Sequence, residues 1–252
     1  MKYVQMIFSP TGGTQKVALA ITENWPSAET VDLSDPHARL EKLALAADDL
    51  VLIAMPSFGG RVPTLAAQRL NRIKGNGAKA VVLCVYGNRA YEDTLVEMQD
   101  LAQAAGFQVI AAVAAIAEHS IIHQYATGRP DAQDRAQLKE FSLQILDKAR
   151  QAEISLPQIP GSRPYKKAGG GGLVPKAGKA CVECGLCADV CPAQAIDKDS
   201  VKTADPQKCI SCMRCVARCP HGAREVNGMM VAAAAMAIKK ACSVRKECEL
   251  YL

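Results

Sequence analysis

Five short runs of apolar residues alternate with amphipathic segments over the first 150 residues of the chain. The runs predict strands at residues 2–8, 28–33, 49–55, 78–86 and 107–117. Apolar positions at helical spacing predict helices at residues 14–25, 36–47, 63–73, 91–106 and 129–150. Strands that alternate with helices form parallel sheets, because each parallel connection must cross back over the sheet. We therefore expect residues 1–152 to form a three-layer α/β domain around a doubly wound, five-stranded parallel sheet.

The alternation stops after Ile154, where proline and glycine become frequent. Pro157, Pro160 and Pro164 are followed by four consecutive glycines at 169–172. This composition is typical of a linker and predicts one at residues 153–174 that can hold the next segment near the first domain or far from it. A small unit at residues 175–227 follows the linker. Residues 228–252 are rich in alanine and predict a C-terminal helix with a solvated basic middle.

Composition excludes several classes of protein. Of the 252 residues, 49% are hydrophobic and 22% are charged, which is typical of a folded chain and excludes wholesale disorder. The longest apolar stretch, residues 229–238, is half as long as a membrane-crossing helix, so we expect no membrane span. The first residues lack the apolar core of a signal peptide, and we expect an unexported, cytoplasmic protein.

Cysteine is the residue whose distribution changes this picture most. Only Cys84 precedes residue 151, whereas the other ten of the eleven cysteines lie between Cys181 and Cys248. An unexported chain keeps its thiols reduced, so metal ligation is favoured over disulfide bonds. Cys84, Cys242 and Cys248 fall outside any ligand pattern. We interpret Cys84 as a buried strand thiol, and Cys242 and Cys248 as structural or weakly reactive thiols.

The remaining eight cysteines form a repeat. The pattern C-x-x-C-x-x-C-x-x-x-C-P occurs at residues 181–192 and again at residues 209–220. This is the ligand spacing of two iron-sulfur clusters in which the fourth cysteine of each unit binds the other cluster. The spacing assigns Cys181, Cys184, Cys187 and Cys219 to cluster one, and Cys209, Cys212, Cys215 and Cys191 to cluster two. The alternative is a pair of zinc sites, which have no use for three ligands at this spacing.

With all eight ligands and both trailing prolines in place, residues 175–227 resemble a two-cluster ferredoxin of the clostridial type. The resemblance implies a small α+β fold, two 4Fe-4S clusters and one-electron chemistry. The resemblance also offers an explanation for an uneven charge distribution. Residues 1–150 have a net charge of −1, whereas the remainder of the chain has +6. A basic half can indicate a nucleic-acid partner. Anionic clusters account for the same excess of Lys and Arg, and we expect no nucleic-acid partner.

A second candidate site lies at the start of the chain. The sequence S-P-T-G-G-T at residues 9–14 follows the first predicted strand and opens a helix. The hydroxyls of Ser9, Thr11 and Thr14 and the N–H groups of Gly12, Gly13 and Thr14 form a candidate phosphate cradle at the helix N-terminus. The loop lacks the glycine patterns of dinucleotide and ATP sites. The alternative is an ordinary glycine-rich turn between strand and helix.

Two further loops follow strands at the same edge of the predicted sheet, at residues 55–63 and 86–93. Ligands of open α/β sheets bind outside the carboxyl ends of the strands, so the three loops predict one pocket. Phe58, Tyr86 and Tyr91 offer flat surfaces for a planar ring, with Tyr86 the one expected nearer the core. Gly59 and Gly60 allow the backbone to approach such a ring, and Asn88 can bond its edge.

These loops resemble those of a flavodoxin, with Ser9 in place of the first threonine of the more usual T-x-T-G-x-T. The whole chain is similar to the fused flavodoxin-ferredoxin proteins of anaerobes, over residues 1–227 and including Y-G-N-R-A-Y-E-D, Glu118-His119-Ser120 and residues 128–131. In this resemblance His119 either approaches the flavin edge or is an ordinary surface histidine. Arg61 and Arg89 are expected to offset negative charge on the flavin. The implied FMN site comprises Ser9, Thr11, Gly12, Gly13, Thr14, Pro56, Ser57, Phe58, Gly59, Gly60, Arg61, Tyr86, Gly87, Asn88, Arg89 and Tyr91.

The resemblance implies an electron-transfer protein that passes electrons between two 4Fe-4S clusters and FMN at low potential, with redox proteins as partners. One alternative is an FMN-dependent reductase of a quinone or nitro compound that is supplied by the clusters. The other is a redox sensor whose ferredoxin unit docks a partner. No long substrate-recognition insertion follows Phe58 or Tyr91, which favours an electron carrier over a substrate-specific catalyst.

Overall fold

A computed structural model describes residues 1–169 and 172–252 of the chain. The larger part is a six-stranded sheet in the order β2-β1-β3-β4-β5-β8. Its first five strands are parallel: β1 (Tyr3–Ile7), β2 (Glu29–Asp32), β3 (Leu50–Pro56), β4 (Lys79–Tyr86) and β5 (Gln108–Ile116). The order 2-1-3-4-5 is that of the flavodoxin-like fold. The predicted α/β fold is therefore confirmed.

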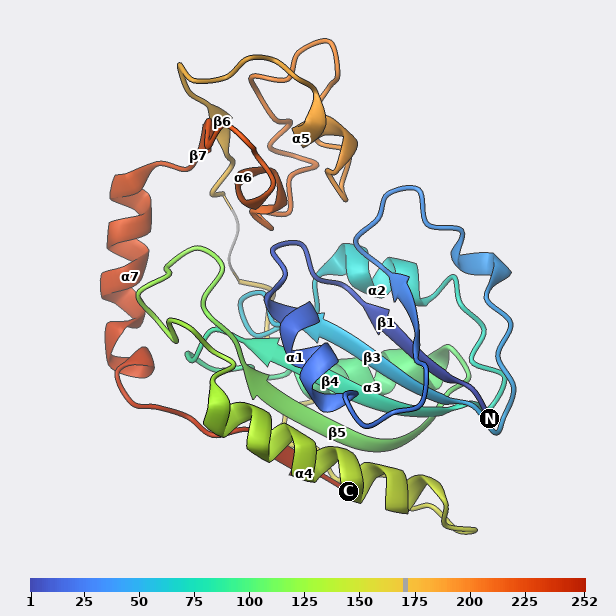
Figure 1. The fold of residues 1–252 in the computed structure, drawn as a ribbon. Helices are drawn as coiled ribbons and strands as arrows, with labels where there is room; N and C mark the ends of the chain where they lie inside the picture. Colours follow the sequence, from blue (N-terminus) through green and yellow to red (C-terminus); the bar gives the residue numbers. More distant parts are fainter. Residues whose placement is uncertain (170–171) are drawn as a thin grey trace.

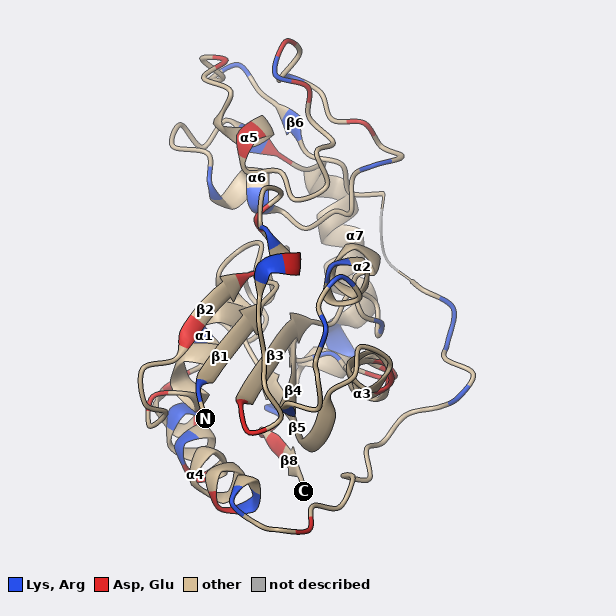
Figure 2. Ribbon diagram, turned by 90° about the vertical axis from the view of Figure 1, so that its right-hand side faces the viewer, with Lys and Arg blue, Asp and Glu red and all other residues tan. Residues whose placement is uncertain are grey.

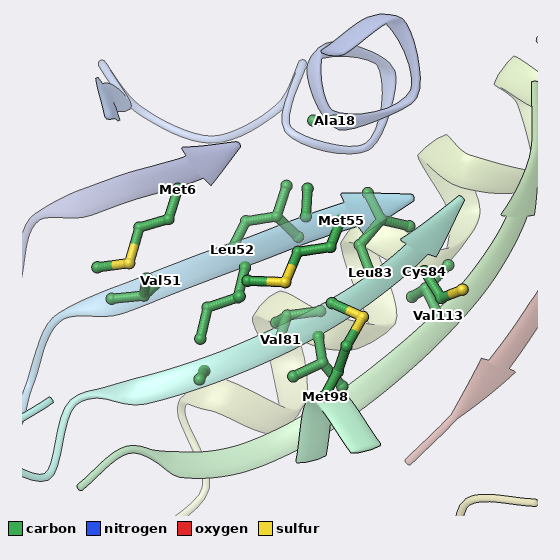
Figure 3. Packing of buried hydrophobic residues seen from close by; sticks show 14 of the residues in the cluster. Met6, Ala18, Val51, Leu52, Met55, Val81, Leu83, Cys84, Met98 and Val113 are labelled. Atoms are coloured by element: carbon green, nitrogen blue, oxygen red, sulfur yellow. The ribbon is translucent and has the colours of Figure 1, made fainter. Parts of the chain in front are cut away.

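Helices cover both faces of this sheet. α1 (Gly13–Ile21) and α4 (Ala132–Ala149) pack on one face, and α2 (Thr64–Leu70) and α3 (Thr94–Ala104) on the other (Figure 2). All residues of β3 except Pro56 are buried, as expected for a central strand with both faces covered. Side chains such as Met55, Leu83 and Met98 meet between the layers (Figure 3). The core lies beneath the carboxyl ends of the strands and fixes the loops that follow them.

One predicted helix is wrong. Residues 36–47 form only a short 3-10 turn, η1 (Leu40–Lys42). The Asp49 carboxylate accepts hydrogen bonds from the backbone N–H groups of Ala46 and Lys2, at 2.9 and 2.8 Å. These bonds hold the end of the segment against the start of β1. Leu40 and Leu45 are therefore buried without a helix between them.

The cysteine-rich residues form a small lobe above the carboxyl ends of the strands (Figure 1). It contains a two-stranded antiparallel sheet, β6 (Lys176–Ala177) with β7 (Arg224–Glu225), and two one-turn helices. These helices are α5 (Leu186–Asp189) and α6 (Arg214–Ala217), and each carries the third cysteine of one repeat unit. The secondary structure is short because the loops around the cysteines occupy most of the lobe.

The segment between the two parts is docked on the first domain. The Gln99 side chain donates to Pro157 O at 2.9 Å, and the backbone N–H groups of Ser162 and Lys166 donate to the Asp93 carboxylate at 2.8 and 2.7 Å. The prediction of a linker with free reach therefore does not describe this segment before residue 167. Its prolines instead suit an extended path beside α3.

The C-terminal segment also departs from the prediction. The helix α7 (Gly228–Cys242) runs down the side of the molecule from the small lobe to the large domain (Figure 1). The chain then turns, and β8 (Glu249–Tyr251) pairs antiparallel with β5. The predicted helix thus ends ten residues early, and the sheet has a sixth strand at its edge. Within the described residues, no helix has the length and apolar character needed to cross a membrane.

Candidate cofactor sites

The loop after β1 forms the first wall of a large cavity. Gly12 has a φ of +93° and precedes α1, so the loop turns sharply into the helix. The Ser9 hydroxyl accepts a hydrogen bond from the Gln15 N–H at 2.9 Å, and the Ser9 N–H donates to the Ser34 hydroxyl at 2.6 Å. Ser9 therefore stabilises the loop through these two bonds and does not line the cavity. Thr11, Gly13 and Thr14 line the cavity at the N-terminus of α1.

The cavity has a volume of about 490 Å³, within the range of small-molecule sites. Four loops at the carboxyl edge of the sheet contribute to it, after β1, β3, β4 and β5. Of the residues expected from the sequence, ten line it: Thr11, Gly13, Thr14, Pro56, Ser57, Phe58, Gly59, Tyr86, Gly87 and Arg89. The other six do not: Ser9, Gly12, Gly60, Arg61, Asn88 and Tyr91.

The loop after β3 is a tight turn that presents Phe58 to the cavity. The backbones of Phe58 and Arg61 bond to each other at 3.0 and 3.2 Å across Gly59 and Gly60. Both glycines have positive φ, +61° and +84°, as a type I′ turn requires. A side chain at Gly60 would place its Cβ 1.7 Å from a Glu92 carboxylate oxygen. Gly60 therefore serves the turn itself, not contact with a ligand.

Arg61 does not face the cavity, contrary to the expectation that it offsets flavin charge. Its guanidinium binds the Glu97 carboxylate through two bonds of 2.7 and 2.8 Å and stacks over the Tyr165 ring at 4.8 Å. The Glu97 hydrogen bond raises the pKa of Arg61. Arg89 does line the cavity, and its guanidinium forms an ion pair with the Glu92 carboxylate at 2.6 Å.

Asn88 and Tyr91 are also directed away from the cavity. The Asn88 amide donates to the carbonyls of Cys242 and Val244 at 3.0 and 2.9 Å. The Tyr91 hydroxyl donates to the Glu249 carboxylate at 2.6 Å, and burial together with this bond raises the pKa of Tyr91. Both side chains therefore hold the C-terminal segment, and the expectations of a ring-edge bond and a stacking surface are wrong for them.

His119 lies at the cavity, on the loop after β5. Its Nδ1 accepts hydrogen bonds from the N–H groups of Ile121 and Ile122, both at 3.2 Å, so the proton of the neutral ring is on Nε2. Burial lowers the pKa of His119, and the nearby charges of His123 and Arg89 lower it further. Of the two interpretations of this histidine, the structure supports the one beside the cavity.

Sequence reasoning missed the far wall of the cavity. Lys166, Gly169 and Leu173 come from the segment between the domains, Ala234 and Ile238 from α7, and Ile210, Ser211 and Cys212 from the small lobe. None of these belongs to a strand-end loop, so the rule that predicted the other walls could not find them. The apolar face of α7 carried the only sequence signal, and it did not specify a partner.

The eight repeat cysteines separate into two groups of four. Cys181, Cys184, Cys187 and Cys219 line one small cavity of the lobe, and Cys191, Cys209, Cys212 and Cys215 line another. Each group combines three cysteines of one unit with the fourth of the other, as the spacing predicts. Within the described residues 1–169 and 172–252, no three His, Cys, Asp or Glu side chains are placed to hold a single metal ion.

Burial shapes the chemistry of the second group. Desolvation raises the pKa of Cys212 to about 12 and that of Cys215 to about 11. These thiols therefore need the charge of a bound metal to become thiolates. Ile196 and Met213 provide an apolar shell around them. In the first group, the guanidinium of Arg224 donates to the Cys187 sulfur at 3.3 Å.

Comparison with known families identifies the small lobe. A model of the 4Fe-4S dicluster domain matches residues 180–223, which include all eight repeat cysteines. The lobe is a 4Fe-4S dicluster domain. The chain thus joins this dicluster domain to a flavodoxin-like α/β domain. We conclude that it is an electron-transfer redox protein, since 4Fe-4S clusters carry single electrons.

Solved structures similar to the chain include flavodoxins. A flavodoxin from the domain Archaea has 16% identity and a TM-score of 0.42, with 60% of this chain and 100% of that chain covered. Flavodoxin 1 of Bacillus cereus has 17% identity and a TM-score of 0.41, with 58% and 98% covered. A comparison with curated proteins gives no match.

Proposed function

We propose that this protein binds FMN in the large cavity and passes electrons between the flavin and the two clusters, with cluster two next to the flavin. The observation that carries the proposal is a shared wall. Ile210 and Cys212 line both the large cavity and the cavity of the second cysteine group. A ligand of cluster two is therefore also a wall of the proposed flavin site.

The residues of the cavity fit FMN. At one end, the hydroxyls of Thr11 and Thr14 and the N-terminal turn of α1 suit the phosphate. Phe58 and Tyr86 provide aromatic surface for the ring system. The neutral imidazole of His119 adds a hydrogen-bond donor, because its Nδ1 is already occupied by two backbone N–H groups.

When bound, FMN exchanges one or two electrons whereas each cluster exchanges one, and this chemistry belongs to the cofactors. The chain keeps the sites close and dry. Ile210 is packed against the core of the first domain, so the partition between flavin and cluster two is fixed. Cys184 is exposed and the Val182 side chain is 61% exposed. We therefore place the contact with redox partner proteins at cluster one.

Cofactor content tests the proposal directly. After anaerobic reconstitution, we expect about eight irons and one FMN per chain. Cys219→Ser should disrupt cluster one, whose other ligands lie in the first unit, and Cys191→Ser should disrupt cluster two. The two variants are matched controls: only Cys191→Ser should abolish rapid electron exchange between iron and FMN, measured by anaerobic stopped-flow absorbance. Equal loss of exchange in both variants would refute the order of the sites.

The flavin site is tested by Thr14→Val, which keeps the shape of the side chain but removes its hydroxyl. We expect FMN affinity to fall by a factor of roughly three to ten, since one hydrogen bond is lost, while iron content is unchanged. Thr22→Val is the control, because the Thr22 hydroxyl bonds to Ala18 O at the other end of the same helix. Titration of FMN fluorescence measures both. Unchanged affinity in Thr14→Val would contradict the assignment of the phosphate end.

A further inference from the structure

The hydroxyl of Ser211 is buried and has no hydrogen-bond partner among the described residues. Ser211 lies between Cys209 and Cys212, next to Ile210, which packs against the core of the flavodoxin-like domain. A buried hydroxyl without a partner costs free energy that a folded protein normally recovers through a bond. This hydroxyl therefore needs a polar group that the described residues do not supply.

The position of Ser211 indicates which cavity supplies that group. Its neighbours Ile210 and Cys212 line both the large cavity and the cluster-two cavity. Ser211 lines the large cavity but not the cluster-two cavity. A residue whose role was to bond the cluster would be expected to line the cluster cavity.

Two arginines join the dicluster domain to the first domain, and one of them lies next to the loop of Ser211. The Arg69 guanidinium on α2 donates to Leu33 O in its own domain and to Pro192 O in the dicluster domain, the latter at 2.8 Å. Arg214, two residues after Cys212, lies 3.5 Å from both Ser9 O and the Asp32 carboxylate. Ser211 is therefore set over the cavity by contacts next to the proposed phosphate loop.

We propose that Ser211 is a flavin-binding residue supplied by the dicluster domain, and that FMN binding and the integrity of cluster two are thermodynamically coupled. This inference rests on the proposed function. The coupling follows because the loop that holds Cys209 and Cys212 also closes the flavin cavity. It is reciprocal: whatever factor the loss of cluster two removes from FMN affinity, the loss of FMN removes from the affinity for cluster two.

Two substitutions test the hydroxyl. Ser211→Ala and Ser211→Gly both remove it, but only glycine is relaxed at the φ of +53° found there. We expect both variants to bind eight irons and to bind FMN three to ten times more weakly than wild type, measured by fluorescence titration. Recovery of wild-type affinity by glycine alone would show that backbone strain is responsible, and would overturn the proposal. So would a change confined to the potential of cluster two.

A pair of cysteine variants tests the coupling. Cys215→Ser removes a ligand of cluster two that does not line the flavin cavity, and Cys184→Ser removes a ligand of cluster one. We expect FMN to bind at least tenfold more weakly to the first and within twofold of wild type to the second. Equal affinities in the two variants would refute the coupling. Failure of the wild-type holoprotein to bind FMN would instead refute the proposed function, so the two failures are distinguishable.

Discussion

At the scale of single residues, the two cysteine loops repeat one backbone conformation with different side chains. Glu183 and Ser211 occupy equivalent positions and have φ of +56° and +53°. The next equivalent pair, Gly185 and Met213, have φ of +80° and +61°. A left-handed conformation costs methionine about 1–2 kcal/mol, which glycine avoids. Met213 is only 3% exposed and lines the cluster-two cavity, so its burial offsets that cost.

Arg224 offers a prediction at this scale, because its guanidinium donates a hydrogen bond to a sulfur of the first cysteine group. Its guanidinium donates to the Cys187 sulfur and, at 3.0 Å, to Pro175 O. Positive charge and hydrogen bonds at a ligand sulfur stabilise the reduced, more negative cluster. Arg224→Met should therefore lower the potential of cluster one, by roughly 60 mV if about 1.4 kcal/mol of differential stabilisation is lost.

Anaerobic potentiometric titration followed by EPR measures this shift. Arg218→Met is the control, since Arg218 is exposed in the same lobe. For a one-electron couple, 59 mV corresponds to a tenfold change in the equilibrium constant. If the potential of cluster one stays within about 10–15 mV of wild type, the result would contradict the role of Arg224.

At the scale of elements, the C-terminal segment is tied to the first domain by hydrogen bonds. Carbonyls at and after the end of α7 accept from the Asn88 amide, and β8 then pairs with the edge of the sheet. The Tyr125 hydroxyl donates to Ala235 O at 2.7 Å and fixes the middle of α7. These contacts hold Ala234 and Ile238 in the wall of the large cavity. Asn88 and Tyr91, which the sequence assigned to the ring, therefore support the wall of the large cavity through the C-terminal segment.

Asn88→Gly should weaken the attachment of the C-terminal segment to the first domain. The substitution removes three side-chain bonds to the C-terminal segment, two donated to the carbonyls of Cys242 and Val244 and one accepted from the Lys246 N–H. It leaves the backbone relaxed at its φ of +65°, so the loss is that of the bonds alone. We expect about 1–3 kcal/mol of local destabilisation, and about 1–2 kcal/mol more in Asn88→Ala, where the backbone is strained. Hydrogen exchange should become faster in α7 and β8 but not in β1. Unchanged exchange in α7 would show that Asn88 does not hold it.

At the scale of the whole molecule, the two domains meet through a few buried polar contacts and an apolar residue. Arg69 joins the two domains, and Ile210 of the dicluster domain packs against the core of the first domain. Burial lowers the pKa of Arg69, whose partners include two carbonyls and no salt-bridged carboxylate among the described residues. This geometry places Ile210 and Cys212 in the wall of the large cavity, and α7 runs beside both domains (Figure 1).

Arg69→Met tests whether this contact fixes the arrangement. The variant keeps the apolar length of the side chain but loses both carbonyl bonds, leaving buried acceptors unpaired. We expect hydrogen exchange in residues 209–215 to increase about tenfold and iron-to-flavin electron exchange to slow. Arg72→Met is the matched control, because Arg72 follows α2 and pairs with Glu41 on the exposed surface. If both variants behave alike, Arg69 does not set the contact between domains.

Much of this protein follows from short-range sequence patterns. The cysteine spacing alone predicts the two crossed groups of four, because two or three intervening residues fix the local turn and the repeat supplies the partner. The apolar runs predict all five parallel strands, and ten of the sixteen residues expected at the flavin site line the large cavity. The helix expected at residues 36–47 fails because Asp49 and Lys2, outside that segment, determine its conformation.

The rest was decided by tertiary contacts. Whether Asn88 faces a ring or a C-terminal carbonyl depends on a segment more than 150 residues away. The same holds for Ser211, which reaches the cavity because contacts of Arg69, Arg214 and Ile210 hold one domain against the other. Local pattern sets the ligand groups and the strands, since their physics lies within a few residues. The relation between the two sites is a property of long-range packing, which no local pattern encodes.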